Sequence, residues 1–226
     1  QFGPFVLQAA DRPPVNSRPV TGTPRYRRRL ELLSRLESRS GAEDPIQELI
    51  DHQTLYEKAS KMILSSQMKA FDLNQETDAM RDDYGRTRFG SGCLLARRLV
   101  ESGVPFVEVV SSGWDTHADN FTRTRQLCEG IDRPMAQLIV DLKQRGLLDS
   151  TLFIVVGDHG EDLGQHGEGS HGLLIYDGTL HVPLLMRLPS RIEPRIIEDT
   201  VGLIDIAPTI CELLDLNAPG DKDGHS

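Results

Sequence analysis

Residues 151–160 read "TLFIVVGDHG", a short apolar run that ends in a carboxylate and an imidazole. The β-branched composition and the length of the run predict a buried strand that stops at Gly157. The chain continues over residues 157–172 as "GDHGEDLGQHGEGSHG", which holds three histidines and four acidic residues. Glycine and polar residues are typical of loops, so this stretch predicts a polar loop at the end of a strand.

Apolar patterns on either side of this strand predict an alternation of helices and strands. Strands are expected at residues 5–7, 104–110 ("VPFVEVV") and 182–189 ("VPLLMRLP"). Helices are expected over residues 25–39, 45–80, 90–103, 123–150 and 205–216, the last with Asp205 as its N-cap. Such alternation is typical of an α/β fold with a mostly parallel sheet. The 226 residues suffice for one sizeable domain, so we expect a single domain over residues 1–226.

The composition limits the classes of function. The net charge of −9 argues against a nucleic-acid binder, but it permits an anionic substrate beside a bound cation. Arginines at 25–29 are better explained as a solvated helix face than as a phosphate or membrane-surface patch. No apolar run approaches the roughly 20 residues that span a bilayer, so no membrane span is expected. Because the chain opens on Gln1 and closes on "DGHS", we expect a fragment or a processed form.

Candidate metal ligands follow two of the predicted strands. Asp115 and His117 ("GWDTH") come after the strand at 104–110, and Asp158 and His159 come after the strand at 151–157. If the two strands run in the same direction in one sheet, both pairs face the crevice beyond its carboxyl edge. Carboxylate and imidazole together suit Zn, Mn, Fe or a similar divalent ion. Taken singly, Asp115 could instead cap a helix and His117 could be an exposed loop residue.

The segment "LFIVVGDHGEDLGQHGEGSHGLLIYDGTLHVPLLM" resembles the C-terminal half of a sulfatase, in the alkaline-phosphatase-like superfamily. The resemblance covers residues about 150–226, including "VGLIDIAPTICELLDL". It implies that Asp158 and His159 bind the metal and that the histidine of "SHG", His171, contacts the sulfate or phosphate ester as a catalytic and substrate-binding residue. The implied cofactor is a divalent metal ion, with Ca, Zn and Mn all open, and the implied substrate is a small anionic ester or a sulfated saccharide.

Residues about 1–150 resemble a bacterial family catalogued as domain of unknown function 1501, in the same superfamily. The resemblance rests on "YGRTRFGSGCLLARRLVESGVPFVEVVSSGWDTHADNF" and "DRPMAQLIVDLKQRGLLDSTL". It implies that Asp115 and His117 are metal ligands and that the protein is periplasmic or extracellular. The two resemblances meet at the strand near residue 151. Together they imply a three-layer α/β fold with a mostly parallel sheet flanked by helices, incomplete at both ends.

The nucleophile of a sulfatase is missing from this sequence. The family pattern requires a Cys-x-Pro-x-Arg motif, and none of Cys93, Cys128 and Cys211 lies in one. A phosphatase-type Ser or Thr could be sought at Thr21 or Thr23, but no metal-binding aspartate precedes them. Three hypotheses follow: a metal-dependent sulfate or phosphate ester hydrolase, a non-catalytic secreted metal-binding or interaction domain, and a hybrid that folds poorly.

Other residues near the loop carry two interpretations each. Glu161 could orient an imidazole from outside the metal's ligand set, or it could only keep the loop soluble. His166 is expected to shape the loop rather than to bind metal. His181 could bind the substrate anion or be a structural histidine at a strand edge. Trp114 is expected to pack beneath the site rather than to form a platform for the substrate.

Overall fold

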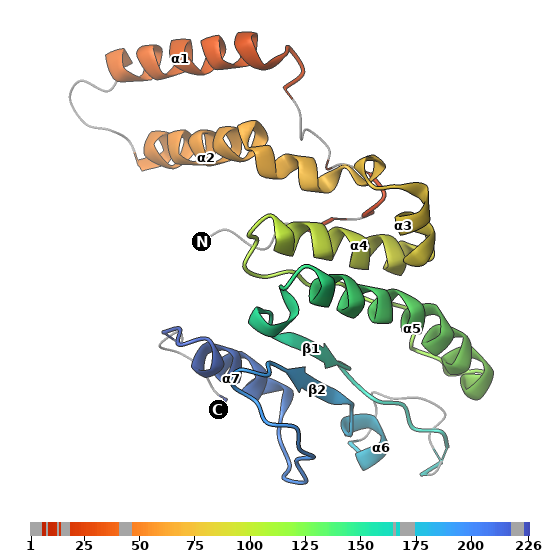
Figure 1. Cartoon of the computed structure of the whole chain (residues 1–226). Coiled ribbons are helices and arrows are strands. Elements are labelled where there is room, and N and C mark those ends of the chain that lie inside the picture. The colour runs from red at the N-terminus through yellow and green to blue at the C-terminus, as the bar shows by residue number, and fades with distance from the viewer. Residues whose placement is uncertain are drawn as a thin grey trace. The chain divides into compact units, whose positions relative to one another are not determined.

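The computed structural model describes residues 6–7, 9–12, 14, 19–40, 47–164, 166–167, 175–217 and 224–226. Figure 1 shows its helices and strands in chain order. The α-helices are α1 (Thr23–Ser40), α2 (Gln47–Leu64), α3 (Asp78–Asp83), α4 (Arg88–Glu101), α5 (Asn120–Gln144), α6 (Asp177–Leu180) and α7 (Ile206–Leu213). The short 3-10 helices are η1 (Ser66–Phe71), η2 (Leu73–Gln75), η3 (Leu148–Ser150) and η4 (Leu203–Asp205). The strands are β1 (Phe153–Val156) and β2 (Leu184–Arg187).

Contacts between residues divide the chain into two compact units. Unit 1 comprises Gln1–Ser112 and Cys128–Asp141, and unit 2 comprises Gly113–Leu127 and Leu142–Ser226. Both stretches that hold the candidate metal ligands, 115–117 and 158–159, fall within unit 2. The candidate site is therefore built within one unit.

The strands predicted at 151–157 and 182–189 are confirmed as β1 and β2, which pair with each other in unit 2. Their pairing is antiparallel, with Phe153 opposite Arg187 and Val156 opposite Leu184. A parallel pair needs a long crossover connection, usually a helix. The described part of the connection contains only the four-residue helix α6, and the chain returns antiparallel.

The strand predicted at 104–110 is described as irregular chain without ladder pairing. Its side chains nevertheless alternate as in a strand, with Val107 and Val109 half-buried and Phe106 and Val110 exposed. The predicted strand is therefore wrong, because no described strand pairs with this segment, and only its alternating burial resembles that of a strand.

The single helix predicted over 45–80 is also wrong, because three polar side chains interrupt it. Ser65 ends α2, and its side chain accepts a hydrogen bond from the Gln67 backbone N–H at 3.1 Å. Asp72 does the same for Asn74 at 3.2 Å, and Thr77 caps α3 by accepting from Met80 at 3.2 Å. Such local side-chain to backbone bonds compete with helix continuation.

Asp205 precedes α7 as predicted, but its side chain does not cap that helix. Its carboxylate accepts backbone hydrogen bonds from Gly202 at 2.8 Å and from His225 at 2.9 Å. Hydrogen bonds from His225 and Gly202 lower the pKa of Asp205. The residue therefore ties the C-terminal segment 224–226 to the start of α7.

Helix α4 carries the apolar core of unit 1. Its Cys93, Leu94, Leu95, Ala96 and Leu99 side chains are all buried. The Thr87 hydroxyl caps the helix by accepting from the Gly90 backbone N–H at 2.9 Å. A side chain at residue 90 would collide with the Tyr84 carbonyl oxygen, so this first turn requires glycine.

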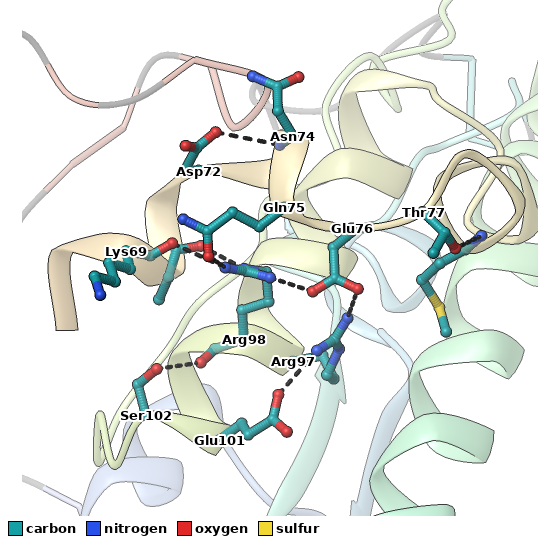
Figure 2. A network of polar contacts seen from close by, with 12 residues as sticks. Lys69, Asp72, Asn74, Gln75, Glu76, Thr77, Arg97, Arg98, Glu101 and Ser102 are labelled. Carbon is teal, nitrogen blue, oxygen red and sulfur yellow. Dashed lines mark hydrogen bonds and ion pairs between the residues drawn. The ribbon is translucent and has the colours of Figure 1, made fainter. Parts of the chain in front are cut away.

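A buried guanidinium lies beside this core (Figure 2). The Arg97 side chain is only 2% exposed and forms ion pairs with Glu76 and Glu101, each at 2.8 Å, and with Asp141 at 3.5 Å. Glu76 also pairs with Arg98. Burial by itself would raise the pKa of Glu76, but the hydrogen bonds and charges of the two arginines outweigh it and lower that pKa. Buried charges of this kind are tolerated only when paired.

We predict that Arg97→Ala destabilises the protein by about 3–5 kcal/mol, because it leaves the buried Asp141 without its cationic partner and Glu76 with Arg98 alone. The measurement is the free energy of unfolding in urea. Arg86→Ala is the matched control, since Arg86 also pairs with two carboxylates, Asp78 and Asp82, but is exposed. The control should lose far less stability. Equal losses in the two variants would contradict a structural role for the buried network.

Candidate functional site

The segment 113–120 presents its two candidate ligands on the same side. Thr116 is 1% exposed, and its hydroxyl accepts a hydrogen bond from the Asn120 side chain at 2.5 Å. Its neighbours Asp115 and His117 are both exposed. In an extended segment alternate side chains point to opposite sides, so burial of Thr116 turns Asp115 and His117 outward together.

The loop after β1 is held by its backbone. Gly160 donates its N–H to the Thr179 carbonyl at 2.8 Å, which ties the loop to α6. A side chain at residue 160 would collide with the Gly178 carbonyl oxygen. Asp158 accepts a hydrogen bond from the His159 backbone N–H at 3.1 Å. The glycine at 160 is thus required by a close approach of two backbones.

Two imidazole–carboxylate pairs join these two segments of unit 2. His159 Nε2 lies 3.3 Å from Asp115 Oδ1, and His117 Nδ1 lies 3.1 Å from Glu161 Oε2. The two stretches singled out from the sequence, "GWDTH" and "GDHGE", therefore lie next to each other, although the first does not follow a regular strand. Asp158 lies in the same loop, with its carboxylate on the loop backbone.

The surroundings of His159 favour a cation between this ring and Asp115. Its Nδ1 lies 3.0 Å from the Gly160 carbonyl, which can only accept, so Nδ1 carries a hydrogen. Nε2 then faces the Asp115 carboxylate, a second acceptor, which requires a proton or a metal ion between them. The pKa of His159 is raised, first by the bond to the Gly160 carbonyl and then, against an opposing effect of burial, by the charges of Asp158, Asp115 and Glu161.

The spacing of Asp115 and His159 fits two neighbouring ligands of one ion. In a tetrahedral zinc site with bonds of about 2.1 Å, adjacent ligand atoms lie about 3.4 Å apart. The 3.3 Å between Nε2 and Oδ1 matches that separation. Among the residues that the structure describes, no three His, Cys, Asp or Glu side chains converge on one point. The fit to a metal ion therefore rests on one pair, Asp115 and His159, which have suitable donor atoms at the spacing of adjacent ligands.

The other histidines of the loop region differ in their contacts. His166 stacks on Tyr176, with ring centroids 3.8 Å apart, and its Nδ1 lies 3.5 Å from Asp162, which is 3% exposed. This geometry agrees with a role in shaping the loop. His181 is exposed directly after α6, and within the described residues no hydrogen bond or ion pair joins its side chain to the four candidate ligands. His171 lies outside the described residues.

Sequence reasoning gave no partner for Glu161 or Asp162. Glu161 pairs with a histidine from a segment more than forty residues earlier, which no local pattern can reveal. Asp162 is a buried carboxylate between exposed neighbours, and the only sequence signal was the histidine four residues later. Both contacts depend on how the chain folds back on itself.

None of the three cysteines forms a disulfide. Cys93 is 1% exposed, and burial raises the pKa of its thiol to about 12. A thiol in this state is not a nucleophile at neutral pH. Thr21 and Thr23 both belong to unit 1.

The model of a family described as "Protein of unknown function (DUF1501)" matches residues 1–181 of this chain. The chain belongs to the DUF1501 family. The match includes "GWDTH" and continues beyond residue 150 through "GDHGE", so one family model spans both segments of the candidate site. No described helix of this DUF1501 chain is long and apolar enough to cross a membrane.

The DUF1501 chain is also similar to sulfatases over less than half of its length. Arylsulfatase K from Bos taurus is 31% identical over 100 residues, which cover 44% of this chain and 18% of that protein. An endo-4-O-sulfatase from Bacteroides thetaiotaomicron is 31% identical over 99 residues, covering 43% and 20%. An extracellular sulfatase SULF-1 homolog from Drosophila melanogaster is 29% identical over 105 residues, covering 46% and 9%. The alignments thus span no more than about a fifth of these relatives.

We predict that Gly160→Ala destabilises the protein by about 1–3 kcal/mol, because the added methyl group meets the Gly178 backbone. Thermal or urea unfolding measures the loss. Gly130→Ala is the matched control, since Gly130 lies in α5 with open space around it and alanine favours a helix. The control should be neutral or slightly stabilising. A neutral Gly160→Ala would contradict the close packing of the loop on α6.

Proposed function

We propose that this protein is a sulfatase-related, metal-dependent hydrolase of sulfate or phosphate esters, with the alkaline-phosphatase-like three-layer fold. Asp115, His117, Asp158 and His159 would hold a divalent ion, with Zn, Mn and Ca as candidates. The observation that carries the proposal is the 3.3 Å between His159 Nε2 and Asp115 Oδ1. That contact joins the two motif segments and has the spacing of adjacent ligands of one metal.

The similarity to sulfatases supports the substrate class. The relatives' names specify sulfatase activity, and one of them specifies an endo-4-O-sulfatase. A sulfated saccharide or another small anionic ester is therefore the proposed substrate, with His171 and His181 holding its anionic group. A bound divalent ion supplies stabilisation of negative charge on the transferring group. A periplasmic or extracellular location is part of the same proposal, supported by the extracellular relative.

The state of the cysteines favours a second candidate, a non-catalytic metal-binding domain. A sulfatase of the usual kind needs a Cys-x-Pro-x-Arg nucleophile, which none of the three cysteines supplies. The raised pKa of the buried Cys93 thiol removes that side chain from consideration. Under this alternative the protein binds the ion with the same four residues but turns over no ester.

We predict one tightly bound divalent ion per chain, and at least a hundredfold weaker binding in His159→Ala and Asp158→Ala, because each variant loses a ligand. Titration calorimetry with Zn²⁺ and Mn²⁺ measures the affinities, and hydrolysis of aryl sulfate and aryl phosphate separates the two candidates. His52→Ala is the matched control, since this histidine lies in α2 beside Tyr56. A folded wild-type chain that binds neither of these ions nor Ca²⁺ would contradict both candidates.

Metal affinity should increase with pH. The raised pKa of His159 keeps its Nε2 protonated to a pH above the ordinary value of 6.5, and the ion must displace that proton. Below that pKa the affinity should fall about tenfold per pH unit, and above it the affinity should level off. Calorimetry in buffers between about pH 5.5 and 8.5 tests this dependence. An affinity that stays constant over this range would contradict binding at His159 Nε2.

A further inference from the structure

We propose that Glu161 is the positioning residue for His117, holding its Nδ1–H so that Nε2 is the nitrogen that binds the metal. The inference rests on the proposed function, because it concerns how the chain prepares a ligand of the same ion. It assigns to Glu161 a role that acts through His117, not a place among the ligands.

The contact between the two side chains has the geometry that this role requires. Glu161 Oε2 lies 3.1 Å from His117 Nδ1, within hydrogen-bond distance. The Glu161 side chain is 13% exposed, whereas the His117 side chain is 47% exposed. The less exposed carboxylate is the more constrained partner, so it fixes the orientation of the ring. A glutamate that served only to keep the loop soluble would be exposed.

The same loop also places an acceptor beside Nδ1 of the second histidine, His159. His159 Nδ1 lies 3.0 Å from the carbonyl oxygen of Gly160, the residue directly before Glu161. Two consecutive residues thus place an oxygen acceptor on the Nδ1 atoms of two histidines, one through the backbone and one through a carboxylate. The neutral form of each ring is thereby set to the tautomer whose lone pair is on Nε2.

This arrangement is the one that metal-binding histidines commonly show. A ligating imidazole usually donates its other N–H to a carboxylate or a backbone carbonyl, which fixes the tautomer and raises the basicity of the ligand. Here one histidine has the carbonyl and the other has the carboxylate. Because Gly160 is anchored to Thr179 at 2.8 Å, the acceptor on each ring is attached to a held loop.

The tautomer of His117 in the metal-free protein is the first measurement. In ¹⁵N NMR spectra of the imidazole nitrogens, we expect wild-type His117 to carry its hydrogen on Nδ1. Glu161→Ala should shift the population toward the Nε2–H tautomer, and Glu161→Gln should restore Nδ1–H, because the amide oxygen still accepts. An unchanged tautomer in Glu161→Ala would overturn the inference, whatever the metal affinity.

Zn²⁺ affinity is the second measurement on the same variants. We expect Glu161→Ala to bind Zn²⁺ about 10–100-fold more weakly than wild type and Glu161→Gln to stay within a few-fold. The exposed Glu198 provides the matched control, and Glu198→Ala should bind as wild type does. If Gln weakens binding as much as Ala does, Glu161 is itself a ligand and the positioning role is overturned. If wild type binds no Zn²⁺ while the tautomer responds as expected, the proposed function fails and Glu161 only orients the ring.

Discussion

Two imidazole–carboxylate contacts hold the segment 115–117 against the loop 158–161, and the candidate site depends on them. The His159–Asp115 contact places two hydrogen-bond acceptors opposite each other, because the Gly160 carbonyl already holds the Nδ1 hydrogen of His159. Such a contact is stable only with a positive charge between the two atoms. A proton fulfils that requirement in the metal-free chain, and a divalent ion fulfils it with two ligands at once. The hydrogen bond to the Gly160 carbonyl is the first cause of the raised pKa of His159, and the charge of Asp115 adds to it. The same two contacts are the basis of the proposed affinity for metal.

The charged groups differ in burial between the two units. In unit 1, Arg97 is almost fully buried and compensated by three carboxylates, with the Tyr84 hydroxyl donating to Asp141 at 3.1 Å. This network is closed, and its charges have partners within the unit. In unit 2 the charged groups of the site are more accessible: the Asp115 side chain is 63% exposed and that of His159 is 37% exposed. Mixed nitrogen and oxygen donors that are accessible in this way suit the divalent ion proposed for the site.

Patterns of local origin were predictable from the sequence. The apolar runs that became β1 and β2 and the periodic segments that became α1, α4, α5 and α7 all follow from side-chain spacing. The motifs "GWDTH" and "GDHGE" could also be singled out from the sequence, because their residue types suit a metal. Contacts set by folding back of the chain were not predictable. The antiparallel direction of β2 depends on its connection, and the choice of His117 as the partner of Glu161 depends on tertiary structure. The breaks at Ser65, Asp72 and Thr77 arise because single hydrogen bonds outweighed a helical pattern.

The most direct test of the account is the position of a bound metal. Crystals of the wild-type chain grown with Zn²⁺ would give an anomalous diffraction signal at the zinc edge. We predict a peak within about 2.3 Å of both His159 Nε2 and Asp115 Oδ1, on the Nε2 side of the His117 ring. A zinc peak elsewhere on the chain, or none within 4 Å of His159 in crystals saturated with zinc, would contradict it.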